Sequence, residues 1–143
     1  MQNDIGILIK HLNEQIEKEA NQLLKQHGLT IAQMRIIEHL YLHQEKPVTQ
    51  KELETCLSIA HPTTVGTLRR LEDKGMITTC LIREGKMSKT VCLTKMGEEA
   101  YVSGKVTASE IESKMQRVLT EEERKNLPDI LIRLRKSLAE GEK

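Results

Sequence analysis

The sequence predicts a mostly α-helical fold with one small β-hairpin, and three observations lead to this fold class. Apolar residues recur at helical spacing over most of the chain, two short β-branched runs flank REGKMS, and long helical patterns occupy both ends. Aromatic residues are limited to two Tyr, so Leu, Ile, Val and Met must build the core. A chain of 143 residues suits one domain, spanning 1–143.

The first half of the chain contains signals for three helices. A long apolar stripe from Ile5 ends at Gly28, which predicts the first helix. Thr30 can cap a second helix that ends at Lys46-Pro47. Thr49 and Glu52 have the spacing of a capping box, which predicts a short third helix.

The second half contains a fourth helix, the hairpin and two further helices. His61-Pro62 opens the fourth helix and Lys74-Gly75 closes it, and the runs MITTCLIR and KTVCLT form the hairpin. A long helix follows Thr94. Thr120 with Glu123 forms a capping box for the last helix. Pro128 should either kink this helix or mark its true first turn.

This order of elements predicts a winged helix-turn-helix over residues 30–95, flanked by long N- and C-terminal helices in 1–28 and 96–143. The flanking helices carry apolar stripes too wide for so small a chain to cover. We therefore expect them to cover one another as the dimerisation lobe of a two-fold homodimer.

Charge and helix periodicity point to double-stranded DNA. Residues 61–95 hold seven Lys or Arg against three acidic residues, whereas the rest of the chain holds 15 against 18. On a helical wheel Val65, Leu68 and Leu71 form the packing side of the fourth helix. The opposite side is polar and comprises Thr63, Gly66, Thr67, Arg70 and Lys74, with Arg69 at the flank. A solvated face of an ordinary helical domain is the alternative interpretation.

In a helix-turn-helix, such a polar side would lie in the major groove, and a basic wing would meet phosphates or the minor groove. The near absence of aromatic residues makes stacking on single strands an unsuitable mode. The candidate DNA-binding residues are Gln50, Thr63, Thr64, Gly66, Thr67, Arg70, Lys74, Arg83, Lys86 and Lys89.

The chain resembles the multiple-antibiotic-resistance regulator (MarR) family. The resemblance rests on TVxxxLxRLExKG in Thr64–Gly75 and on LTxxG in Leu93–Gly97, and it extends over essentially the whole chain. It implies a homodimeric transcription regulator, most simply a repressor, that binds a pseudo-palindromic operator and responds to a small anionic or phenolic effector. The family usually carries an acidic residue followed by Arg in the wing, where this chain has Gly85-Lys86, so Lys86 with Arg83 would substitute.

Cysteine and histidine offer two further hypotheses. A hairpin centred on residue 86 would set Cys80 opposite Cys92, which permits an oxidation switch, although two reduced packing cysteines are the favoured interpretation. His39 and His43 have a metal-ligand spacing on a helix, but no His or Cys follows Cys92, so surface histidines are favoured and no cofactor is expected.

Other classes of protein are less consistent with the sequence. Catalytic fingerprints and paired nucleophiles are lacking, so an enzyme is not expected. No apolar run approaches a membrane span or a signal peptide, and the few cysteines fit a reducing cytoplasm. The alternatives to a DNA-binding regulator are a winged-helix protein-interaction module and a ligand sensor with weak DNA binding.

Overall fold

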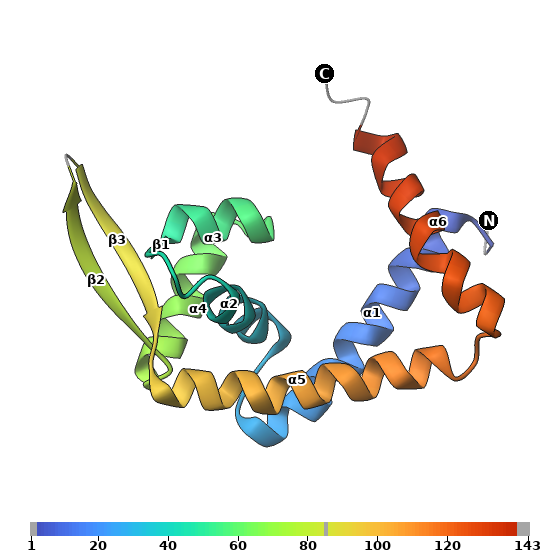
Figure 1. Ribbon diagram of the computed structural model, residues 1–143, viewed down its shortest axis with the longest axis horizontal. Coiled ribbons are helices and arrows are strands. Elements are labelled where there is room, and N and C mark those ends of the chain that lie inside the picture. The colour runs from blue at the N-terminus through green and yellow to red at the C-terminus, as the bar shows by residue number, and fades with distance from the viewer. Residues whose placement is uncertain (1–2, 85, 140–143) are drawn as a thin grey trace. The chain divides into compact units, whose positions relative to one another are not determined.

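The structure, a computed structural model, describes residues 3–84 and 86–139, and for residues 82–84 and 86–88 it gives the backbone but not the side chains. The described elements follow the predicted order (Figure 1): α1 (Ile5–Leu24), the 3₁₀ turn η1 (Lys25–His27), α2 (Ile31–Leu42), β1 (Val48–Thr49), α3 (Gln50–Leu57), α4 (His61–Asp73), β2 (Ile77–Glu84), β3 (Lys86–Leu93), α5 (Lys95–Gln116) and α6 (Glu121–Ala139). The predicted helical fold with a small sheet is confirmed. The short strand β1, which completes a three-stranded antiparallel sheet in the order β1-β3-β2, was not predicted.

Helix starts follow the predicted caps. The Thr30 hydroxyl accepts the Gln33 amide at 3.2 Å, and the Gln33 side chain accepts the Thr30 amide, which completes a capping box. Thr120 and Glu123 form the same reciprocal pair at the start of α6. At the start of α3 the capping box is only half formed. The Thr49 hydroxyl accepts the Glu52 amide, but the Glu52 carboxylate contacts a histidine of α2 instead of the Thr49 amide.

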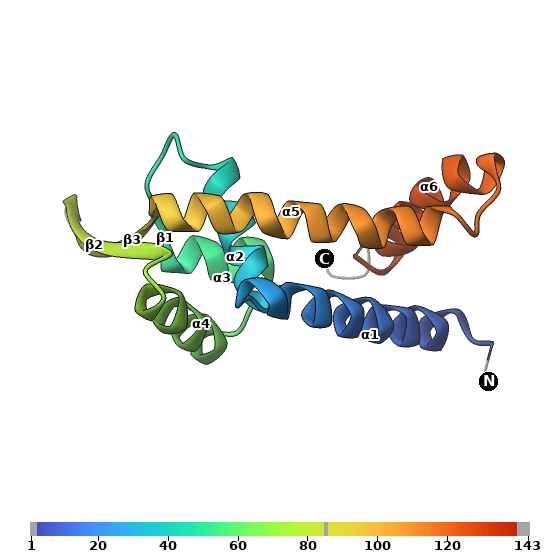
Figure 2. The same ribbon diagram turned by 90° about the horizontal axis from the view of Figure 1, so that it is seen from below.

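Two compact units make up the chain, residues 1–108 and 109–143, and α5 runs from the first into the second. The core of the first unit lies where α2, α3, α4 and the sheet converge. Its fully buried side chains are Ile36, Ile37, Leu53, Thr64, Leu71, Ile77 and Val91. The hairpin of β2 and β3 projects beyond these helices in both views (Figure 1, Figure 2).

The hairpin register differs from the predicted one by two residues in the partner strand, which moves the centre of the hairpin by one residue. Cys80 pairs with Thr90 and Cys92 pairs with Thr78, so the turn is centred on residue 85 rather than 86. The prediction that the two cysteines oppose each other is therefore wrong, and both are free and exposed. A shift of two residues in the partner keeps each side chain on its own face of the sheet and changes every cross-strand pair.

The junction between α4 and α5 explains the two motifs that appeared most specific in the sequence. Gly75 adopts a left-handed conformation with φ +75°, which a side chain would strain. The Thr94 hydroxyl donates to the Gly75 carbonyl at 2.6 Å and accepts the Gly97 amide at 3.1 Å. A Cβ at Gly97 would collide with the Met76 carbonyl, so this glycine lets α5 start directly against the turn that follows α4.

Gly104 has a similar role further along α5. A Cβ there would come within 2.6 Å of the Met34 methyl group of α2. The glycine therefore allows α5 to approach α2 closely enough to cover the core of the first unit.

In the second unit, α6 runs from Glu121 through Pro128 without a break. The helix therefore does not begin at Pro128, which corrects one of the two predicted outcomes. A proline removes one amide donor from the ladder, and an exposed helix can tolerate that loss better than a buried one.

Long helices of both units expose apolar side chains. On α1 they are Ile5, Ile7, Leu8, Ile9 and Leu12, and on α6 they are Leu127, Ile130, Leu131, Ile132 and Leu138. Among the described residues of α6, none is buried. The predicted uncovered stripes are present, while the assignment of 1–28 and 96–143 to a dimerisation lobe stays a prediction. Within the described residues, no helix is both long enough and apolar enough to cross a membrane.

Candidate nucleic-acid interface

The orientation of α4 about its own axis differs from the predicted one. Thr64 and Thr67 are 0% and 4% exposed and pack inward with Leu68 and Leu71, whereas Val65 is only half-buried. The Thr64 hydroxyl donates to the Ala60 carbonyl and that of Thr67 to the Thr63 carbonyl, at 3.1 and 2.8 Å. The prediction that Thr67 lies on the outward side is wrong, because both threonines satisfy their hydroxyls within the helix and present methyl groups to the core.

The outward face of α4 contains Thr63, Gly66, Arg69 and Arg70, which we name the α4 face. Both arginines and Thr63 are exposed, and Gly66 is half-exposed. Neither arginine has an ion-pair partner among the described side chains, those of residues 3–81 and 89–139. Arg69, which the sequence placed at the flank, thus belongs with Arg70 on the same accessible surface.

Gly66 differs from the glycines of α5. A Cβ at Gly66 would contact only the end of the Arg70 side chain, 3.9 Å away, so a larger residue would fit here without a clash. Its φ is not positive either. Packing inside the chain therefore does not require a glycine here, although glycine in a helix interior costs about 1 kcal/mol relative to alanine.

Lys74, another candidate DNA contact, is engaged inside the chain. Its ammonium group donates to the Gly28 carbonyl and, at 3.0 Å, to the Gln33 side chain. Lys74 therefore ties the end of α4 to the turn between η1 and α2. Lys74 remains exposed, but its ammonium group is engaged by these two acceptors of the same chain.

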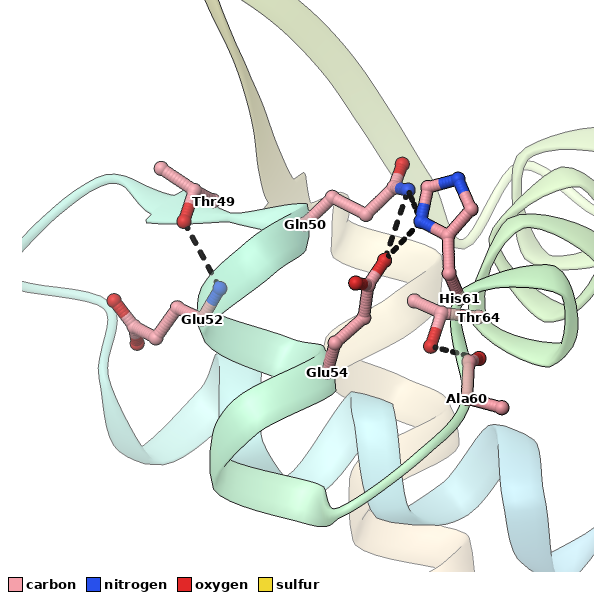
Figure 3. Close-up of polar contacts among 7 residues, drawn as sticks. All are labelled: Thr49, Gln50, Glu52, Glu54, Ala60, His61 and Thr64. Atoms are coloured by element: carbon pink, nitrogen blue, oxygen red, sulfur yellow. Dashed lines mark hydrogen bonds and ion pairs between the residues drawn. The ribbon is translucent and has the colours of Figure 1, made fainter.

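A polar cluster joins α3 to the first residue of α4 (Figure 3). One carboxylate oxygen of Glu54 accepts from Gln50 Nε2 at 3.1 Å and lies 2.7 Å from His61 Nδ1. The Glu54 side chain is 20% exposed and that of His61 is 67% exposed. Donation from Gln50, and then from His61, holds the pKa of Glu54 below its ordinary value of 4.5.

Among the predicted wing contacts, Lys89 is the one whose side chain the structure describes. It is exposed on β3, where it pairs with Leu81 of β2. The side chains of Arg83 and Lys86 lie outside the described residues. Gln50 is half-buried beside Glu54, to which its amide nitrogen donates.

His39 and His43 stack on each other with ring centroids 4.2 Å apart. His39 Nε2 lies 3.0 Å from the Glu52 carboxylate, and His43 Nδ1 donates to the His39 carbonyl at 2.8 Å. His39 is only 10% exposed, so it is not the surface histidine that the sequence suggested. In the part of the chain that the structure describes, no group of three or more His, Cys, Asp or Glu could hold a metal ion.

Sequence reasoning missed Glu54, His61 and Arg69. The pair Gln50 and Glu54 has the i, i+4 spacing of a helix contact, which was a usable signal. His61 stands beyond the turn between α3 and α4, where Ser58 adopts φ +52°, so only the path of the turn brings it to Glu54.

The helix pair α3–α4, the exposed α4 face and the adjoining hairpin define a winged helix-turn-helix protein. Comparison with known proteins agrees. Residues 27–86 match the sequence model described as MarR family. Over 99 residues the chain is 35% identical to the HTH-type transcriptional regulator YwoH of Bacillus subtilis (strain 168). This matched segment covers 66% of this chain and 69% of YwoH. The chain therefore belongs to the MarR family.

Solved structures show the same fold. The MepR–DNA complex of Staphylococcus aureus superposes with a TM-score of 0.83 at 26% identity, over 94% of this chain and 96% of MepR. MepR in its DNA-binding conformation gives 0.79 at the same identity, over 94% of this chain and 98% of MepR. A probable transcriptional regulator of Pseudomonas aeruginosa gives 0.81 at 23% identity, over 93% and 98% of the two chains, which supports the fold alone.

Proposed function

We propose that this protein is a dimeric transcription regulator that binds a pseudo-palindromic site in double-stranded DNA and acts as a repressor. The observation that carries the proposal is the α4 face. It is an accessible surface with two arginines that have no ion-pair partner among the described side chains, on a helix whose other side packs into the core. MepR, which has the same fold, has been solved in complex with DNA, and this supports DNA as the partner.

The α4 face suits the major groove for a physical reason. Arg69 and Arg70 provide donors for phosphate or guanine, and Thr63 provides a short hydroxyl that can reach a base edge. Gly66 leaves bare backbone between them, which lets the helix axis approach a partner more closely. The contact set that we propose therefore comprises Gln50, Thr63, Gly66, Arg69, Arg70 and Lys89, together with the wing residues Arg83 and Lys86 as the sequence predicted them. Thr64, Thr67 and Lys74 leave it.

The exposed apolar residues of α1 and α6 support the homodimer. Ile5 and Leu12 are 61% and 54% exposed, and a contiguous exposed stripe of this kind is costly in water. A second copy would bury these side chains and place two α4 helices about one DNA turn apart.

A small-molecule effector would act by favouring one arrangement of the two reading helices over another. A pocket of about 190 Å³ lies where the end of α2 meets β1 and β3, with Leu40, His43, Lys46 and Cys92 in its lining. Its volume suits only a small ligand. Lys46 gives the lining a positive charge, which fits the anionic effector that the sequence resemblance implied.

The test is a fluorescence anisotropy titration with DNA from the region upstream of the protein's own gene, at two salt concentrations. We expect sequence-preferring binding that weakens steeply with salt. Arg69→Ala and Arg70→Ala should each weaken binding about tenfold and lower the salt slope by about 1. The matched control is Arg35→Ala. Arg35 of α2 forms a surface ion pair with Glu17 of α1, so this substitution removes the same charge away from the α4 face.

Binding that is indifferent to sequence, or no binding at low salt, would refute the proposal. The second outcome would favour a winged-helix protein-interaction module. Binding that is weak but sensitive to an effector would favour a ligand sensor. In each case we expect the protein to act in the cytoplasm and to catalyse no reaction, as befits a regulator.

A further inference from the structure

The Glu54–His61 pair offers a contact that the α4 face by itself does not explain. His61 is the first residue of α4 and its ring is mostly exposed, yet one ring nitrogen is fixed by the carboxylate of α3 (Figure 3). Ionised Glu54 can only accept, so His61 must donate from Nδ1. The remaining nitrogen, Nε2, has no partner within the part of the chain that the structure describes.

The protonation state of His61 decides what Nε2 can bind. In the neutral ring with hydrogen on Nδ1, Nε2 is an acceptor and would repel a phosphate oxygen. In the protonated ring, Nε2 is a charge-assisted donor and suits a phosphate. A phosphate contact at Nε2 therefore requires the ring to be protonated.

Glu54 offsets the forces that oppose this positive charge. The start of a helix carries a partial positive charge, which disfavours a cation at its first residue. Lys51, also on α3, acts on the Glu54 carboxylate and adds a further positive charge near the cluster. The carboxylate 2.7 Å from Nδ1 is thus the group that stabilises an imidazolium here.

We propose that His61, oriented by Glu54, donates from Nε2 to a DNA backbone phosphate, and that each protomer takes up one proton when this contact forms. The proton adds to the ring as the N–H···O bond to the phosphate forms, and it comes from the solvent. Glu54 is then a positioning residue, and Gln50, which donates to the same carboxylate oxygen, fixes the rotamer of Glu54. This inference rests on the proposed function.

The experiment measures DNA affinity of the full chain from about pH 6 to about pH 8 at constant ionic strength, the range in which histidine titrates. Because the pKa of Glu54 lies below 4.5, that carboxylate stays ionised throughout. Wild-type affinity should rise as pH falls, by at most about tenfold per pH unit for each protomer. Loss of the contact should cost about tenfold for each protomer at low pH.

Three variants separate a DNA contact from a merely structural role. His61→Gln should flatten the pH profile, and Glu54→Gln should shift its midpoint to lower pH. His27→Gln, in the exposed turn η1, is the matched control and should keep the wild-type profile. The unfolding temperature of each variant, measured over the same pH range, reports whether the fold is retained.

The outcomes are distinguishable. Tight wild-type binding with a flat pH profile, or an unchanged slope in His61→Gln, overturns the proton-linked contact and leaves the proposed function standing. A uniform loss of affinity at all pH values in His61→Gln, together with a lower unfolding temperature, also overturns it, because His61 would then only join α3 to α4. Failure of the wild type to bind DNA at every pH overturns both proposals.

Discussion

The junction between α4 and α5 and the α4 face use similar residues for opposite purposes. Both contain threonine and glycine, and both lie within the motifs that resemble the MarR family. At the junction, Gly75, Thr94 and Gly97 each have an internal reason, namely a left-handed turn, two hydrogen bonds and a close carbonyl. On the α4 face, the described part of the chain supplies no such internal reason for Gly66 or for the two arginines.

This difference shows how one family motif divides between architecture and binding. A residue that internal contacts account for should affect folding when it is changed. A residue that they do not account for should affect a partner. Four predictions follow this division, in order of decreasing expected effect.

Gly97→Ala should destabilise the fold by about 2 to 3 kcal/mol, because the added methyl group must displace backbone rather than a flexible side chain. The added Cβ would collide with the Met76 carbonyl and lie 2.8 Å from Leu93 Cδ2. Urea unfolding monitored by circular dichroism measures the change. Gly66→Ala is the matched control, and it should instead stabilise the fold by about 1 kcal/mol. Equal effects of the two substitutions would contradict the comparison.

Gly66→Leu should weaken DNA binding by about tenfold or more while the fold is retained, because a bulky side chain would hold the helix away from the groove. Anisotropy titration gives the affinity, and the unfolding temperature gives the control. A variant that folds and binds like the wild type would show that close approach is not the reason for this glycine.

Thr94→Val should cost about 1 to 2 kcal/mol of stability, because it removes the cap of α5 and the bond to the Gly75 carbonyl together. Thr94→Ser keeps the hydroxyl and serves as the control, with a smaller expected loss. Urea unfolding of both variants measures the difference. Indistinguishable midpoints for Val and Ser would show that the hydroxyl does not hold the junction.

Thr67→Val should cost about 0.5 to 1.5 kcal/mol of stability, because a hydroxyl bonded to the Thr63 carbonyl is replaced by a methyl group. Its effect on DNA affinity should be small, since Thr67 is 4% exposed. Thr63→Val should show the reverse pattern, with unchanged stability and altered sequence preference. If Thr67→Val changes base preference instead, the rotation of α4 seen in the structure would not be the DNA-bound one.

Local signals in the sequence were sufficient for most of the secondary structure. Thr30 and Thr120 cap the helices that they were predicted to cap, because a capping box involves residues only three positions apart. The order of helices and hairpin follows from periodicity for the same reason. Pro128 is a partial exception, because a local rule suggested a helix start that the chain does not use.

Packing between elements was harder to predict. A wheel with three apolar residues could not fix the rotation of α4, since the core also accepts the methyl groups of Thr64 and Thr67 once their hydroxyls bond within the helix. The hairpin register was also missed, since β2 and β3 pair two residues away from the predicted partners and the sequence holds no local signal for that choice. His39 was predicted to lie on the surface, whereas in the structure it is mostly buried and paired with Glu52.

The sequence by itself determined the fold class, the element order, the uncovered apolar stripes and a basic region around α4 and the hairpin. These depend on periodicity, capping and composition, which act over a few residues. Only the tertiary structure decided which side of α4 faces outward, that Lys74 is occupied, and that Glu54 meets His61. Those outcomes depend on how elements distant in sequence pack, and no local spacing fixes the rotation of one helix against another.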